Sequence, residues 1–206
     1  MLDTKNLRFN YDNNLELNFP DIKTSKENLL ILGASGVGKT TFLHLLSGLL
    51  KPMNGEIDLL GTKISNLKMS EMDRFRGKNI GIVFQKPHFI NSLTVKENLQ
   101  LAQYISKKSD KNRIQSLLES LGIEDKANKK TQNLSQGEKQ RVSIALAIVN
   151  SPKLILADEP TSSLDDLNCD KVINILKNQA SKYKAKLIII THDHRLKKHF
   201  KNTLSL

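Results

Sequence analysis

Four short runs of apolar residues stand out along the chain and indicate the framework of its fold. They occupy residues 29–32, 80–84, 154–157 and 187–190. A strand that is apolar at consecutive positions has no solvent-facing side, which is typical of a parallel sheet covered by helices on both faces. The pattern therefore predicts an α/β fold with a mainly parallel core built from these four segments.

The rest of the chain follows two other patterns. Residues 1–20 and 55–61 have the features of short strands and turns, which predicts an antiparallel β flap beside the core. Residues from about 88 to 150 have helical spacing, with Thr94 as an N-terminal cap. We find no repeat or low-complexity linker, so residues 1–206 are predicted to form a single domain, with a helical subdomain inserted in the α/β core.

A phosphate-binding loop follows the first apolar run. The segment Gly33-Ala34-Ser35-Gly36-Val37-Gly38-Lys39-Thr40 has the P-loop spacing and leads into a helical pattern, which is the context that this motif requires. Its glycines let the backbone approach phosphates, Lys39 reaches the β- and γ-phosphate oxygens, and Thr40 can bind Mg²⁺. Thr41 adds a hydroxyl near the α-phosphate. An incidental glycine-rich turn is disfavoured because the spacing and both flanks agree.

Two carboxylates, Asp158 and Glu159, end the third apolar run. Ligands of open α/β sheets bind at the carboxyl edge of the strands, which is where this pair is expected to lie. Asp158 would complete the Mg²⁺ shell, and Glu159 could polarise a water for attack on the γ-phosphate. The alternative is a solvated acidic turn, which the apolar strand before it disfavours.

A second helix start suited to an anion lies at residues 134–141, which read Leu-Ser-Gln-Gly-Glu-Lys-Gln-Arg. A helix that begins with Ser and Gly presents free N–H groups and a positive dipole end. One phosphate site needs only one such helix N-terminus. The second therefore suggests that another copy of the chain takes part.

In their order along the chain, these motifs resemble the ATP-binding cassette (ABC) ATPases, from about residue 1 to about residue 200. The resemblance implies a P-loop NTPase of the ABC nucleotide-binding type, with a mainly parallel RecA-like core, an antiparallel β flap and an inserted helical subdomain. It implies that Gln85 contacts Mg²⁺ or the attacking water, that His192 is the switch histidine, and that Asp165 lies in the loop crossing the dimer interface. Tyr11 fits the aromatic residue that stacks on adenine. Tyr11 as a half-buried strand residue and His192 as an ordinary turn residue are the alternatives.

The same resemblance explains the second helix start. In this family Ser135 and Gly137 of one subunit cap the γ-phosphate held by the other, so that two ATP molecules are buried between two head-to-tail subunits. Gln136 and Glu138 replace the family's usual glycine and glutamine, and we interpret both as tolerated. Leu146 stands where relatives often carry Arg, which puts an expected salt bridge in doubt.

The residues can be grouped by the roles that the resemblance implies. The catalytic set is Lys39, Gln85, Glu159 and His192. The Mg²⁺ ligands are Thr40, Gln85 and Asp158. The ATP-binding set is Tyr11, Gly33, Ala34, Ser35, Gly36, Val37, Gly38, Lys39, Thr40, Thr41, Ser135, Gly137 and Asp165.

The predicted function is that of an ATP-hydrolysing subunit that dimerises around two ATP molecules, as a homodimer or with a related ATPase, and drives a separate integral membrane permease. Residues 87–90 offer apolar and aromatic side chains for contact with that permease, although they could instead pack in the core. Residues 93–98 and 150–161 look like the lipoprotein-releasing and macrolide-exporting branch, which also includes a cell-division ATPase. The alternative is a soluble ABC ATPase acting on nucleic acid or ribosomes.

Composition bears on compartment and partners. Without an apolar run of about 20 residues or a signal-like start, we expect a cytoplasmic protein, peripheral on the inner face of the cell membrane. The single Cys169 has no partner for an internal disulfide and suggests a reducing compartment. The net charge of +11 would attract anionic lipid or nucleic acid, or it could reflect a lysine-rich solvated surface. We favour the solvated surface, and no nucleic-acid partner is expected because no such motif is present.

Overall fold

A five-stranded parallel sheet forms the centre of the computed structural model, which describes residues 2–11, 16–24, 27–162 and 164–206. Its strand order is β10-β4-β9-β8-β7. The strands are β10 (Asn202–Ser205), β4 (Leu29–Leu32), β9 (Lys186–Thr191), β8 (Leu154–Asp158) and β7 (Ile80–Val83). The predicted α/β fold is confirmed, and β10 is a fifth strand that the apolar pattern did not reveal. At the edge of the sheet, β10 has exposed residues at alternate positions and therefore lacks an apolar run.

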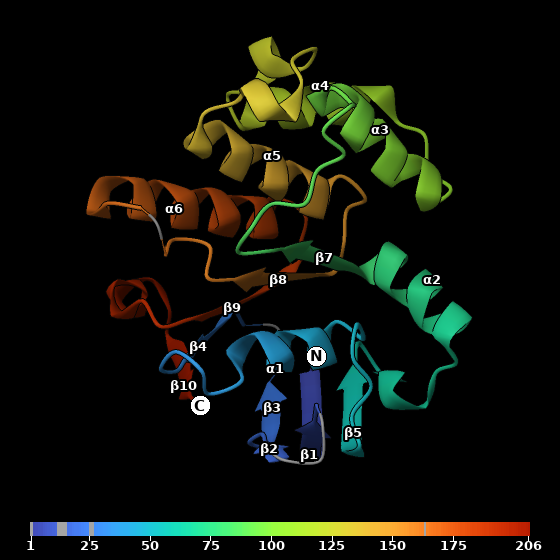
Figure 1. The fold of residues 1–206 in the computed structure, drawn as a ribbon, viewed down its shortest axis with the longest axis vertical. Helices are drawn as coiled ribbons and strands as arrows, with labels where there is room; N and C mark the ends of the chain where they lie inside the picture. The colour runs from blue at the N-terminus through green and yellow to red at the C-terminus, as the bar shows by residue number, and fades with distance from the viewer. Residues whose placement is uncertain (1, 12–15, 25–26, 163) are drawn as a thin grey trace.

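A second, antiparallel sheet corresponds to the predicted β flap. Its strands are β1 (Leu2–Asn10), β2 (Glu16–Asn18), β3 (Ile22–Thr24), β5 (Asn54–Leu59) and β6 (Thr62–Lys63). Helix α1 (Lys39–Leu46) lies between the two sheets (Figure 1). Its side chains Phe42, Leu43 and Leu46 are fully buried in a cluster shared by both sheets. The helix that follows the P-loop is thus held on two sides by apolar packing.

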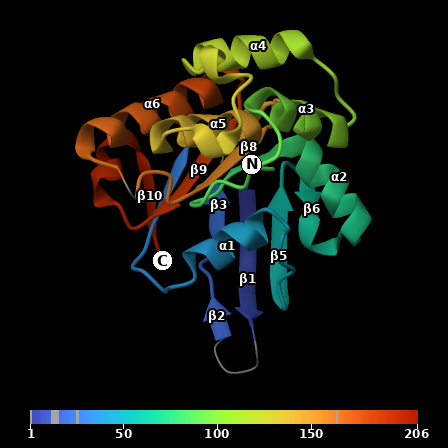
Figure 2. The ribbon, with the colours of Figure 1, turned by 45° about the horizontal axis from the view of Figure 1, so that its top comes forward.

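The remaining helices gather on the other side of the parallel sheet, as Figures 1 and 2 show. They are α3 (Val95–Ile105), α4 (Lys111–Ser120), α5 (Gln136–Ile148) and α6 (Asp166–Lys182), while α2 (Met69–Asn79) leads into β7. Short 3₁₀ turns occur at η1 (Ile64–Asn66), η2 (Glu124–Lys126), η3 (Thr131–Asn133) and η4 (His194–His199). Thr94 caps α3 as predicted, because its hydroxyl accepts a hydrogen bond from the Glu97 N–H.

Helix α5 packs directly on β7 and so connects the helical segment to the sheet. The contact is close: a Cβ atom at Gly81 would lie 2.0 Å from the Ala147 carbonyl oxygen. Leu146 packs against the same core. No helix within the described ranges is long and apolar enough to cross a membrane.

We expect Gly81→Ala to lower the free energy of unfolding by about 1–3 kcal/mol, because a methyl group there overlaps the backbone of α5. Urea denaturation followed by circular dichroism measures this change. The matched control is Gly77→Ala in α2, where the new Cβ meets only Ser106 Oγ at 3.5 Å. Alanine favours a helix over glycine, so the control should be stabilised by about 0.5–1 kcal/mol. Equal effects of the two substitutions would contradict the packing argument.

Candidate functional site

The strand order brings three chain segments together at one edge of the parallel sheet. Strands β4 and β8 flank β9, and all three run in the same direction. Leu32 pairs with Thr191, and Asp158 pairs with Ile190, so the residues that follow these strands start side by side. The Gly33 N–H donates to the Thr191 carbonyl at 3.2 Å. This edge therefore collects the P-loop, the carboxylate pair and the predicted switch histidine.

The P-loop turns sharply into α1. Gly36 and Gly38 have φ values of 86° and 93°, which side-chain-bearing residues rarely adopt, and Gly38 caps the helix. The Lys39 ammonium folds back over the loop and donates to the Ala34 carbonyl at 2.8 Å. The loop thus surrounds a lysine that is only 7% exposed.

Asp158 has the features of a metal ligand. Its Oδ2 accepts a hydrogen bond from Thr40 Oγ1 at 2.8 Å, whereas its buried Oδ1 has no partner among the described residues. Burial raises the pKa of Asp158, the Thr40 hydrogen bond opposes the rise, and the Glu159 charge adds to it. A cation beside the unpaired oxygen would relieve that burial penalty. Hydroxyl and carboxylate oxygens are the ligands that Mg²⁺ prefers, so the residues fit this ion.

Glu159 leaves the strand in a left-handed conformation, with φ of 46°. Its carboxylate accepts hydrogen bonds from Thr191 Oγ1 at 2.6 Å and from the His192 N–H at 3.1 Å. His192 Nδ1 lies 2.8 Å from Oε1, and Lys39 Nζ lies 3.3 Å from the same atom. Burial alone would raise the pKa of Glu159, but the Thr191 and His192 hydrogen bonds outweigh it, and the pKa is lowered. The carboxylate is consequently held ionised between Lys39 and His192.

Behind this edge lies a polar network that the sequence analysis missed. The buried Asp193 carboxylate accepts hydrogen bonds from Thr161 Oγ1 at 2.9 Å and from the Arg195 guanidinium at 2.9 and 2.7 Å. Its own N–H donates to the Thr191 hydroxyl at 3.0 Å. The network joins the loop after β9 to the loop after β8. The polar run immediately after a fully apolar strand was the only sequence signal for it.

Other predicted site residues lie around this centre. The Tyr11 hydroxyl is 2.9 Å from Thr41 Oγ1, and its ring is largely exposed beside the P-loop helix. Gln85 follows β7 with an exposed side chain that has no hydrogen-bond partner in the part of the chain described. Asp165 caps α6 by accepting from the Asn168 N–H at 2.8 Å. Of residues 87–90, Phe89 packs against the core and Ile90 stays exposed.

The helix start at residues 134–141 contacts the loop after β8 through Gln140, whose Nε2 donates to the Pro160 carbonyl at 3.2 Å. Ser135 caps α5, its N–H donates to Glu138 Oε2 at 2.8 Å, and the Glu138 N–H donates to Ser135 Oγ at 3.3 Å. Lys126 lies 3.3 Å from Glu138 Oε1. A Cβ atom at Gly137 would meet only Arg141 Nη1, at 3.7 Å. Among the described residues, no hydrogen bond joins Ser135 or Gly137 to the P-loop.

A parallel sheet with a P-loop, a carboxylate pair and a histidine at its carboxyl edge defines a P-loop ATPase of the α/β class. The chain belongs to the ABC transporter family, whose model matches residues 19–162. It is an ATP-binding and ATP-hydrolysing subunit of an ABC transporter.

Relatives and solved structures support this assignment. The chain is 40% identical to the lipoprotein-releasing system ATP-binding protein LolD of Buchnera aphidicola over 81% of its own length and 74% of the relative's. The LolD of Treponema denticola is 39% identical over 88% and 80% of the two chains. A dimeric ABC transporter cassette, MJ0796, is 30% identical with a TM-score of 0.90, covering 100% and 94%. The same cassette is known in a dimeric post-hydrolysis state bound to ADP and Pi.

We expect Asp193→Asn to lower the free energy of unfolding by about 2 kcal/mol at pH 7. The Arg195 hydrogen bonds lower the pKa of Asp193 from 3.8 to about 2, so its ionised form stabilises the fold above pH 4 and this contribution is lost as the pH falls toward 2. The difference in the free energy of unfolding between wild type and variant, measured by urea denaturation, should therefore narrow as the pH falls from about 4 to about 2. The control is Asp170→Asn, which breaks a more exposed pair with Lys198 and should change stability by less than about 1 kcal/mol. A pH-independent difference would contradict the role of the charge.

Proposed function

We propose that the chain is the ATPase subunit of a lipoprotein-releasing transporter and works at the cytoplasmic face of a membrane, bound to an integral permease. The observation that carries the ATPase chemistry is the convergence of Lys39, Thr40, Asp158, Glu159 and His192 at one sheet edge. The lipoprotein-releasing branch is supported by LolD relatives at 36–40% identity. We propose that the permease selects the cargo.

Mg²⁺ is the second part of the proposal. Thr40 Oγ1 and the unpaired Oδ1 of Asp158 would hold the ion, with Gln85 reaching it from the end of β7. When bound, Mg²⁺ supplies charge neutralisation at the β- and γ-phosphate oxygens. Asp158 is suited to this because its raised pKa reflects a buried charge whose present partner is a neutral hydroxyl.

The neighbouring residues would then act on the γ-phosphate and on water. Lys39 would exchange the Ala34 carbonyl for phosphate oxygens, and His192 would donate to the same phosphate. Glu159 has the lowered pKa of an ionised group and would orient the attacking water and accept its proton. Glu159 already contacts both Lys39 and His192. Binding of the γ-phosphate would therefore change the contacts of all three side chains.

The site would be completed by a second subunit. Ser135 and Gly137 lie at the start of α5, where neither has a hydrogen bond to the chain's own P-loop among the described residues, and the related MJ0796 cassette is dimeric. We propose that this N-terminus caps the γ-phosphate bound by the partner, with Asp165 at the interface. Tyr11 would stack on the adenine from beside Thr41.

We expect Glu159→Gln to reduce ATP hydrolysis on the order of 10²–10⁴-fold while ATP still binds, because the amide cannot accept a proton. With ATP bound and unhydrolysed, the variant should run as a dimer in size-exclusion chromatography. Glu119→Gln, in α4 and exposed, is the matched control and should keep both wild-type activity and wild-type elution. A Glu159→Gln chain that binds ATP yet stays monomeric would count against the composite site.

The partner proposal is tested in membranes. A tagged chain, purified from detergent-solubilised membranes with and without nuclease treatment, should carry an integral permease with it in both cases. Ile90→Asp places a charge on an exposed apolar residue near Gln85 and should weaken that co-purification, whereas Ile90→Leu should not. Recovery of an RNA-dependent complex in place of a membrane protein would support the soluble alternative.

A further inference from the structure

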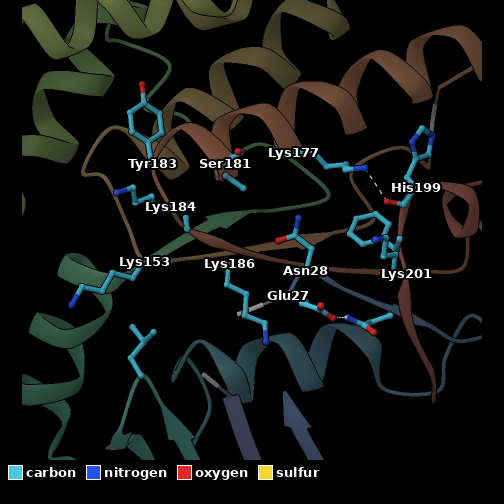
Figure 3. A pocket seen from close by; sticks show the side chains of 15 residues that line it. Glu27, Asn28, Lys153, Lys177, Ser181, Tyr183, Lys184, Lys186, His199 and Lys201 are labelled. Carbon is cyan, nitrogen blue, oxygen red and sulfur yellow. Dashed lines mark hydrogen bonds between the residues drawn. The ribbon is translucent and has the colours of Figure 1, made fainter. Parts of the chain in front are cut away.

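A large cavity lies at the opposite edge of the parallel sheet from the P-loop. It has a volume of about 990 Å³, within the range of small-molecule sites. Its walls come from the residues that precede β4, β8, β9 and β10 and from the C-terminal end of α6 (Figure 3). None of the residues that we place in ATP chemistry lines it. The cavity is therefore separate from the nucleotide site.

Positive charge dominates the lining. It includes the lysines Lys153, Lys177, Lys184, Lys186 and Lys201. The one carboxylate among the described lining residues, Glu27, already accepts a hydrogen bond from Asn202. In Figure 3 the lysines stand around the cavity, not in one cluster. A ligand that contacted several of these lysines at once would need negative charges at separate positions.

Two side chains add polar character to the inner wall. Asn28 Oδ1 accepts from the Leu187 N–H at 3.0 Å, which leaves its Nδ2 as a donor without an acceptor among the described residues. Lys186 is only 6% exposed and donates to the Thr24 hydroxyl. Burial lowers the pKa of Lys186 to about 8, with the Glu27 charge opposing the change. A cationic group is thus kept beside the cavity despite a burial penalty.

Lys184 occupies a conformation that favours glycine. It has φ of 52° and follows α6 in a Schellman motif, in which the Lys184 N–H donates to Ser181 and the Ala185 N–H donates to Ala180. Lysine here retains the strain that glycine would remove. The dipole of α6 attracts a lysine at this point, but it does not account for the lysines that precede or begin β8, β9 and β10.

From this geometry we infer that the cavity binds an anion that carries several phosphate groups. The charges of the described lining come from lysines, and a lysine ammonium binds phosphate oxygens as a point charge, so several spaced lysines suit a ligand with several phosphate groups. Two kinds of ligand could present these phosphate groups: a soluble polyphosphate compound, or the headgroups of anionic phospholipids at a membrane surface. The inference is independent of the proposed transport function.

The test uses the full chain in a Lys39→Ala background, which weakens phosphate binding at the P-loop. Titration calorimetry with sodium tripolyphosphate should detect binding. Lys184→Gly should weaken it about fivefold, the factor that one lysine contributes at an anionic surface, and Lys153→Gln/Lys184→Gly/Lys201→Gln should weaken it on the order of 100-fold. Lys184→Gly should also raise Tm, since glycine suits the backbone, so weaker binding could not be ascribed to unfolding.

The chain offers a matched control in α3. Lys107 has φ of 54° and ends α3 in the same Schellman motif, but it lies outside the cavity. Lys107→Gly should raise Tm in the same way and leave tripolyphosphate affinity unchanged. A second triple variant removes the same number of lysine charges from exposed positions outside the cavity: Lys107→Gly/Lys111→Gln/Lys129→Gln. It should bind tripolyphosphate with wild-type affinity.

Vesicles separate the two sources. Sedimentation with phosphatidylglycerol vesicles that depends on Lys184, together with no binding of tripolyphosphate, would identify lipid headgroups; binding of tripolyphosphate alone would identify a soluble ligand. The inference is overturned if neither probe binds, or if both sets of lysine variants weaken binding equally. It is also overturned if a single-stranded oligonucleotide is the only probe that binds.

Discussion

The carboxylate of Glu159 joins the ends of separate chain segments, and the geometry of the ATP site depends on it. Thr191, the last residue of β9, and His192, which follows it, donate to this carboxylate, and Lys39, at the start of α1, lies 3.3 Å away. A carboxylate that is 7% exposed requires such partners, because an unpaired buried charge is strongly unfavourable. The same residue bends the backbone after β8 through its left-handed conformation. Lys39 and His192 thus share one oxygen of this carboxylate, Oε1.

The fold was predictable where burial leaves a clear pattern. Strands β4, β8 and β9 are buried at every position, so their apolar runs marked both their type and their parallel arrangement. Strand β10 has exposed residues at alternate positions and β6 has only two residues, so neither carries an apolar run. The pairing of β10 with β4 also joins segments that are far apart in the chain, which a single sequence does not reveal.

The candidate site likewise has features that the sequence predicted and features that it did not. The meeting of the P-loop, Asp158 and His192 followed from strand ends in one sheet, whereas the positive φ of Glu159 and the Asp193 network depend on loop conformation. A lone chain also cannot display a contact made by a partner subunit. Ser135 illustrates this, since its hydrogen bonds within the chain serve only to begin α5. The proposed role of Ser135 in a composite site rests on its position at the start of α5 and on the dimeric MJ0796 cassette.

Glu138 shows how the chain accommodates a departure from the family's usual glutamine. A capping box accepts either residue at the third helical position, and here the carboxylate receives the Ser135 N–H. The added negative charge would oppose a phosphate at this helix start, but Lys126 lies 3.3 Å from its other oxygen. The Ser135 hydrogen bond chiefly lowers the pKa of Glu138, and Lys126 contributes in the same direction. The substitution thus keeps the cap, and its charge is partly offset by Lys126 of η2, which also pairs with Asp125.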